Sequence, residues 1–363
     1  MDITGQKVLV RVDWNLPNLQ ALERIRASLP TLLELFRNNN TIILLTSWGR
    51  PNGQRDNEFS TEKLIPLLGR ELLGSGIDTT IFFADQTVNF QAARNTINSC
   101  GLNGKNIVLL ENTRFMQDEV SSDKNIRLTL AAQYATLGNY YVNEAFSVSH
   151  RVEATITELE TLLPSELGVN YQDEITHLKA LKRAKSPYVV VLGGAKLETK
   201  LPLLDKLVQV ADQVLLAGTI CFSFLREMNN LDLKDTKVDI EYSAQVVELL
   251  NKYSDKILLP SDLIFEEKDS YSRAVDIGKK TIEEYTKTLE SAKTIFWNGT
   301  IGYVEGGFIA GNQAITQAIT TNYRAYTVVG GGDTVASLSP ELLSEFGWVS
   351  TGGGATLNFL TKK

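Results

Sequence analysis

The chain has 363 residues, of which 43% are hydrophobic and 22% charged, and its formal net charge at pH 7 is −7. This composition is that of a globular protein, and the chain is too long for one ordinary core, so two domains are expected. The negative net charge argues against nucleic acid as the main partner.

The few cysteines and histidines exclude further classes of protein and site. Cys100 and Cys221 are the only cysteines and form no C-x-x-C pair, so no disulfide framework is indicated. His150 and His177 are the only histidines, which excludes a multi-histidine metal site. Because no apolar leader and no run of 18 apolar residues is visible, we expect a cytoplasmic protein without a membrane partner. A monomer is also expected, although the sequence does not determine the oligomeric state.

Short apolar runs rich in Val and Ile alternate with longer amphipathic segments along the chain. The first series of predicted strands covers residues 7–12, 41–45, 80–83, 106–110 and 140–143. The second series covers residues 188–192, 213–217, 256–259, 294–297 and 325–329. Fully apolar strands separated by helical segments indicate parallel sheets covered on both faces. The sequence therefore predicts an α/β protein with two doubly wound, Rossmann-like parallel-sheet domains.

A helix is predicted at the join between the two series. Ile175, Leu178 and Leu181 follow a helical spacing, and Pro187 ends or kinks that helix before the next strand. An ordinary surface helix would show the same pattern. We predict an N-terminal domain over residues 1–167, an inter-domain helix over 168–185 and a C-terminal domain over 186–363.

Two glycine triplets near the C-terminal end are the most informative motif. Gly330-Gly331-Gly332-Asp333-Thr334 and the segment 350–355 (STGGGA) each follow an apolar run. Glycine turns that lead from a strand into a helix let backbone N–H groups approach a phosphate, and Asp333 adds a carboxylate suited to Mg²⁺. Glycine-rich turns also occur in α/β proteins without such a site.

Further motifs occur in a fixed order along almost the whole chain. They are residues 8–17 (VLVRVDWNLP), 109–115 (LLENTRF), 142–146 (VNEAF) with His150-Arg151 after it, 192–196 (LGGAK) and 297–299 (WNG). Together with the glycine triplets, this series resembles the phosphoglycerate kinase family. The resemblance implies reversible, Mg²⁺-dependent phosphoryl transfer between 1,3-bisphosphoglycerate with ADP and 3-phosphoglycerate with ATP, a step of glycolysis.

The resemblance implies that the N-terminal domain binds 3-phosphoglycerate. By that match the arginines hold its phosphate and carboxylate, while Asp13 and Asn15 hold its hydroxyl group. The substrate-binding residues would be Asp13, Asn15, Arg24, Ser47, Trp48, Gly49, Arg50, Arg114 and Arg151. Arginine suits this work because its planar fork binds phosphate or carboxylate in a bidentate manner and stays charged.

The resemblance assigns the nucleotide to the C-terminal domain. Lys196 and Lys200 are spaced i,i+4 after a Gly-Gly turn, which puts both ammonium groups on one helix face; a solvated helix face would show the same spacing. The nucleotide-binding residues would be Lys200, Gly218, Asn298, Glu305, Gly331, Gly332, Asp333 and Thr334, with Asp333 holding Mg²⁺. The catalytic residues would be Arg24, Lys196, Lys200, Gly332 and Gly353.

Several positions depart from the family pattern. Ser47 stands where the family has histidine, and Ala217-Gly218-Thr219 stands where three glycines are usual. Lys279 adds a cation without an assigned role, and we expect the short C-terminus to loosen the coupling between domains. These departures keep a nucleotide-binding pseudoenzyme, or a kinase with altered base or substrate preference, as alternatives. A nicotinamide-dependent oxidoreductase lacks support, because no strand-linked G-x-G-x-x-G is present.

Overall fold

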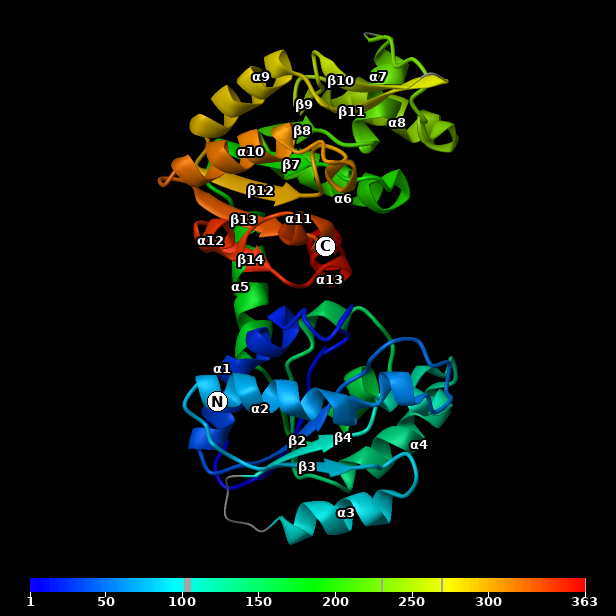
Figure 1. Ribbon diagram of the computed structural model, residues 1–363, viewed down its shortest axis with the longest axis vertical. Coiled ribbons are helices and arrows are strands. Elements are labelled where there is room, and N and C mark those ends of the chain that lie inside the picture. The colour runs from blue at the N-terminus through cyan, green and yellow to red at the C-terminus, as the bar shows by residue number, and fades with distance from the viewer. Residues whose placement is uncertain (101–105, 230, 269, 363) are drawn as a thin grey trace. The chain divides into compact units, whose positions relative to one another are not determined.

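The computed structural model describes residues 1–100, 106–229, 231–268 and 270–362. The chain forms two compact units, Met1–Ile175 and Thr176–Lys363 (Figure 1). Each unit contains one six-stranded parallel sheet, which confirms the predicted α/β class with two doubly wound sheets. None of the helices in the described parts of the chain is both long and apolar enough to cross a bilayer.

The sheet of the first unit has the strand order β3-β4-β2-β1-β5-β6, with every pair parallel. Its strands are β1 (Lys7–Arg11), β2 (Thr41–Leu45), β3 (Ile81–Ala84), β4 (Ile107–Leu110), β5 (Tyr140–Asn143) and β6 (Ser165–Leu167). Its main helices are α1 (Glu23–Arg37), α2 (Ile65–Gly74), α3 (Phe90–Ser99) and α4 (Lys124–Ala135).

Strand β1 shows why both faces of this sheet are covered. Successive side chains of a strand point to opposite faces, so Val8 and Val10 join the core under α1 and α2, whereas Leu9 joins the core under α3 and α4. Figure 1 shows these two helix pairs on opposite sides of the sheet. The residues at the centre of the strand are apolar because neither face meets water, although β1 ends in the buried, charged Arg11.

The sheet of the second unit has the order β14-β13-β12-β7-β8-β9 and is also parallel. Its strands are β7 (Tyr188–Leu192), β8 (Gln213–Leu216), β9 (Ile257–Leu258), β12 (Thr294–Asn298), β13 (Tyr326–Gly330) and β14 (Trp348–Ser350). Its helices are α6 (Leu197–Val210), α7 (Ile220–Met228), α8 (Ser243–Tyr253), α9 (Lys279–Glu290), α10 (Ala310–Thr321), α11 (Gly332–Ala336), α12 (Pro340–Ser344) and α13 (Gly354–Thr361). An antiparallel hairpin of β10 (Leu263–Lys268) and β11 (Tyr271–Ile277) adds to this unit.

The structure differs from the predicted strands at the edges of both sheets. Strand β6 was not predicted, and β9 is shorter than the predicted segment 256–259. Strand β14 was anticipated only as the apolar run before the second glycine triplet. An edge strand of two or three residues is too short to show a period. The β10–β11 hairpin was also missed, because its strands carry charged and exposed residues among the apolar ones.

Helix α5 (Val169–Lys182) carries the chain from one unit to the other, and the division falls between Ile175 and Thr176 within it. At its start, the Val169 N–H donates to Thr31 Oγ1 at 2.7 Å in the first unit. Near its end, Leu178 and Leu181 are buried in the second unit. The predicted helical spacing at the join is therefore present.

Candidate active site

The loop that follows β1 positions the first two predicted residues. Asp13 is almost fully buried, and its Oδ2 accepts hydrogen bonds from Arg24, the second residue of α1, and from Ser147. The side chain of Asn15 accepts a hydrogen bond from the Gly49 N–H at 2.9 Å. Chain segments from three loops thus meet where the β1 strand ends, as expected for a parallel sheet.

The segment after β2 contains the first departure from the family pattern. Ser47 is fully buried, and its hydroxyl accepts a hydrogen bond of 3.2 Å from Arg11. Trp48 is buried as well and donates through Nε1 to the Leu16 carbonyl at 2.9 Å. In contrast, Arg50 is exposed. Ser47 therefore has an interior partner among the protein's own side chains.

Two predicted arginines share one carboxylate. Glu153 Oε1 lies 3.0 Å from Arg114 Nη2 and 3.7 Å from Arg151 Nη1, and its Oε2 lies 3.0 Å from the buried Arg11. Burial by itself would raise the pKa of Glu153, but the charges of Arg11, Arg114 and Arg151 lower the pKa overall. Glu153 is thus a charged anchor for the arginine cluster.

The sequence interpretation missed the residues that support this cluster: Arg11, Glu119, Ser147 and Glu153. Arg11 carried a signal, because a charge inside an otherwise apolar strand is buried only when it is paired. Burial, together with repulsion from Glu153, raises the pKa of Glu119 to about 8. Its Oε1 accepts a hydrogen bond from Thr155. No local pattern marks Glu119 or Glu153, since they meet Arg11 only in the folded chain.

In the second unit, the predicted nucleotide residues gather at the carboxyl ends of β12 and β13. Lys200 donates to the Asn298 side-chain oxygen, and the Asn298 amide donates to the Gly330 carbonyl at 2.9 Å. Thr334 accepts a hydrogen bond of 2.7 Å from the Gly299 N–H. Burial lowers the pKa of Lys200 to about 8, although the charge of Asp333 acts to raise it.

The glycines of these turns are required by close backbone approach. A Cβ on Gly193 would overlap the Thr300 carbonyl oxygen, and one on Gly299 would overlap the Gly193 carbonyl oxygen. Gly331 and Gly353 have φ angles of 102° and 51°, and each immediately precedes a helix, α11 and α13 respectively. The two glycine triplets therefore form strand–turn–helix junctions, as predicted.

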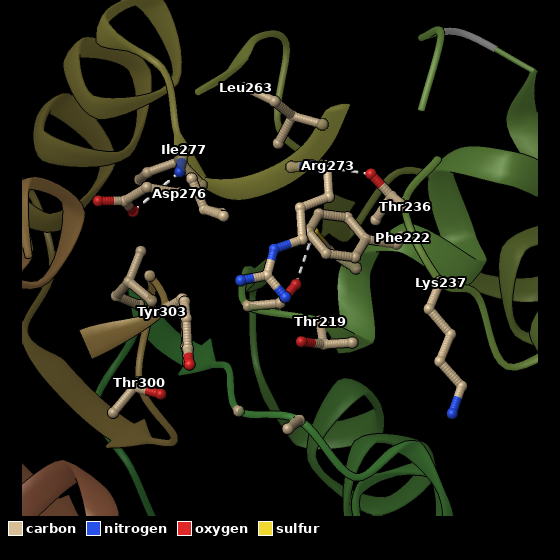
Figure 2. Close-up of a pocket in the computed structure, with 18 of the residues that line it drawn as sticks. Thr219, Phe222, Thr236, Lys237, Leu263, Arg273, Asp276, Ile277, Thr300 and Tyr303 are labelled. Atoms are coloured by element: carbon tan, nitrogen blue, oxygen red, sulfur yellow. Dashed lines mark hydrogen bonds between the residues drawn. The ribbon is translucent and has the colours of Figure 1, made fainter. Parts of the chain in front are cut away.

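A cavity of about 350 Å³ lies in the second unit beside these turns (Figure 2). Three predicted nucleotide residues line it: Gly218, Glu305 and Asp333. Its wall also contains Thr219, the departure from the family glycine, and Arg273, whose guanidinium lies 5.1 Å from the centre of the Tyr303 ring. Figure 2 shows Arg273 projecting into this space between Tyr303 and Phe222. Lys196 is exposed and does not line the cavity.

The remaining predicted residues fit a site for anionic groups. A methyl group at Gly332 or Gly353 would meet no described atom within 4 Å, so space is open beside both. In the described parts of the chain, no group of three or more His, Cys, Asp or Glu residues could hold a metal ion. A single carboxylate at Asp333 suits Mg²⁺, which takes most of its ligands from phosphates and water.

Comparison with known proteins identifies the family that this chain is similar to. A sequence model of one family, phosphoglycerate kinase, matches residues 1–363. The phosphoglycerate kinase of Salinispora arenicola is 35% identical over 387 residues, covering 100% of this chain and 94% of the relative. That of Corynebacterium aurimucosum is 34% identical, covering 99% and 94% respectively.

Solved structures give the same result for the fold. The phosphoglycerate kinase from Coxiella burnetii is 27% identical and superposes with a TM-score of 0.84, covering 100% of this chain and 95% of the other. The Pyrococcus horikoshii OT3 enzyme is 26% identical with a TM-score of 0.85, covering 99% and 94%. The resemblance seen in the sequence motifs is confirmed, and this chain belongs to the phosphoglycerate kinase family.

Proposed function

We propose that the two units of this kinase divide the substrates, the first binding 3-phosphoglycerate and the second the magnesium nucleotide. The first unit supports this through its arginines. In the free protein Arg24 pairs with Asp13, and Arg114 and Arg151 with Glu153. A substrate phosphate and carboxylate would compete for the same guanidinium groups, since these bind any well-placed oxyanion.

In the second unit, we assign the base and ribose to the cavity near Gly218 and Glu305. The phosphates then lie along Gly331, Gly332 and Thr334, where backbone N–H groups open a helix. The observation that carries this assignment is Lys200, because a half-buried ammonium that donates to Asn298 beside these turns is suited to binding phosphate.

The residues present fit a magnesium ion held with the nucleotide. Asp333 is in the first turn of α11 and lines the cavity, so its carboxylate faces the same space as the phosphates. Mg²⁺ would neutralise part of the phosphate charge when bound.

The reaction requires positioning and charge neutralisation, with no proton transfer in the forward step. A carboxylate oxygen of 3-phosphoglycerate attacks the γ-phosphorus of ATP, the bond to the β,γ-bridging oxygen breaks, and ADP leaves with that electron pair. Arg24, Lys196 and Lys200 stabilise the charge on the moving phosphoryl group, and the Gly353 and Gly332 N–H groups orient it. We therefore assign these five residues the catalytic roles.

Base preference is an open question for this chain, because Ala217-Gly218-Thr219 stands where the resemblance implies three glycines. Thr219 and Arg273 both line the cavity, and the Arg273 guanidinium also pairs with Glu266 at 2.7 Å. This observation favours an altered base preference as a second candidate. Comparing ATP with GTP as phosphoryl donors measures it directly, since a donor or acceptor opposite the wrong base edge is left unpaired.

The function is tested with a coupled assay on the purified protein. ADP should form from ATP only when both 3-phosphoglycerate and Mg²⁺ are present. Undetectable turnover together with intact nucleotide binding would support the pseudoenzyme alternative instead.

We also propose that the enzyme acts as a cytoplasmic monomer. Both predicted half-sites lie within one chain. Cys100 and Cys221 are both free thiols, as suits a reducing compartment.

A further inference from the structure

A second cavity of about 870 Å³ lies at the opposite end of the second sheet from the glycine turns. Lys293 and Thr294 at the start of β12 and Tyr326 at the start of β13 line it, whereas Asn298 and Gly330 at the other strand ends belong to the nucleotide site. The rise of four residues from Thr294 to Asn298 along β12 corresponds to about 13 Å, so this cavity is separate from the one at the nucleotide site.

The lining of this cavity is strongly basic. Its charged residues are Arg183, Lys185, Lys293, Arg324 and Glu290. Four cations and one carboxylate leave a formal balance of three positive charges, in a chain whose net charge is −7. Within the described residues, none of the four cations lies within 4.0 Å of a carboxylate oxygen. The positive charge is therefore not neutralised by ion pairs within the described parts of the chain.

The negative partial charges of nearby helix C-termini offset only part of this positive charge. Helices α5, α9 and α10 end next to or within the lining, and each C-terminus carries a partial charge of about −0.5, or about −1.5 in total. The α9 terminus also has another partner, because the Asn322 amide donates to the carbonyls of Leu289, Glu290 and Ala292. A positive excess remains after both effects.

The wall of the cavity is held in place by interactions of its uncharged side chains and backbone, while the four cationic side chains are exposed. His177 stacks on Trp348 with ring centres 4.1 Å apart and hydrogen bonds through Nδ1 to the Tyr326 hydroxyl. Thr294 accepts from the Lys185 N–H at 3.1 Å and donates to the Lys185 carbonyl at 3.0 Å. A fixed wall reduces the ordering that a ligand would have to impose on binding.

We propose that this basic cavity is a second ligand site, distinct from the nucleotide site, for a small multivalent anion of the polyphosphate type. Multivalency follows from the four separate cations, which together complement several negative charges better than one. The inference does not depend on the roles assigned above to the glycerate and nucleotide residues.

The test uses the two histidines as separate reporters. Histidine ring resonances are followed by NMR while inorganic tripolyphosphate is added to the full chain, with sodium chloride at matched ionic strength as the reference. His177 lines the cavity, whereas His150 adjoins Arg151 in the other unit. A saturable shift of the His177 resonance by tripolyphosphate, well below the concentration at which orthophosphate acts, is expected. Equal responses to tripolyphosphate, orthophosphate and sodium chloride would overturn the proposal.

Paired variants locate the site. Lys293→Gln with Arg324→Gln should weaken the His177 response roughly tenfold, which is about 1.4 kcal/mol. Lys179→Gln with Lys287→Gln removes two exposed lysines outside the cavity lining and should leave the response unchanged. Both double variants should keep kinase activity, because none of these residues belongs to the proposed active site. Equal weakening by both pairs, or by neither, would show that the anion does not bind at this cavity.

Discussion

At the scale of single residues, the arginines of the first unit are held by protein carboxylates. Asp13 forms an ion pair with Arg24, and Glu153 forms ion pairs with Arg11, Arg114 and Arg151. A carboxylate shared by several cations fixes their positions without cancelling their charge. Such preorganised charge is suited to stabilising a transition state, because little reorganisation remains at the moment of reaction.

Arg24 and Ser47 should differ in their effect on turnover. Removing one preorganised donor to a transition state costs on the order of 3 kcal/mol, so Arg24→Ala should lower kcat a hundredfold or more. Ser47→Ala should leave kcat nearly unchanged, because its hydroxyl faces the buried Arg11. Steady-state kinetics of both variants, with thermal unfolding as the folding control, check this. Small and equal effects would contradict the assigned roles.

Lys200 should give the enzyme an alkaline limb in its pH profile. Burial lowers the pKa of this ammonium to about 8, and only the charged form attracts phosphate. Therefore kcat/KM for MgATP, which reports the free enzyme, should fall as the pH rises through about 8. Lys200→Arg should remove this limb, since a guanidinium stays charged, even where its absolute rate is lower. An unchanged limb in that variant would assign the titration to another group.

At the scale of elements, the glycine turns serve two different purposes. Gly193 and Gly299 allow two strand ends to approach so closely that a methyl group at either would overlap a backbone oxygen. Gly332 instead borders open space at the start of α11. The first kind of glycine is needed for folding, and we propose that the open space beside the second accommodates the nucleotide.

This distinction predicts opposite outcomes for two alanine variants. Gly299→Ala places a Cβ against the Gly193 backbone at a φ of 100°, so it should destabilise the second unit by more than about 4 kcal/mol. Gly332→Ala should leave the melting temperature nearly unchanged but reduce kcat/KM for the nucleotide. Thermal unfolding and kinetics separate the two effects. A stable Gly299→Ala protein would show that the turns can move apart.

At the scale of the whole molecule, the predicted glycerate and nucleotide residues belong to different units. Phosphoryl transfer requires reacting atoms about 3–3.5 Å apart. We therefore expect the units to open for ligand exchange and to close when both substrates are bound. Small-angle scattering should show a smaller radius of gyration for the ternary complex than for the free or binary forms. The same radius in all forms, with normal activity, would rule out hinge closure.

The sequence by itself determined the α/β class, the strands of both sheet centres and the family. These follow from local signals, since buried parallel strands are continuous apolar runs and the turn motifs keep a fixed order. The strand–turn–helix form of Gly331 and Gly353 was also readable, because only glycine adopts such φ angles easily.

Only the tertiary structure decided what depends on residues far apart in the chain. Glu153 lies 142 positions from Arg11, and no local pattern marks it as that arginine's partner. The buried orientation of Ser47 and the pKa of Lys200 likewise depend on packing and desolvation, which no spacing encodes. The basic cavity gathers cations from three separate segments, at residues 183–185, 293 and 324, so its charge appears only once the sheet has brought them together.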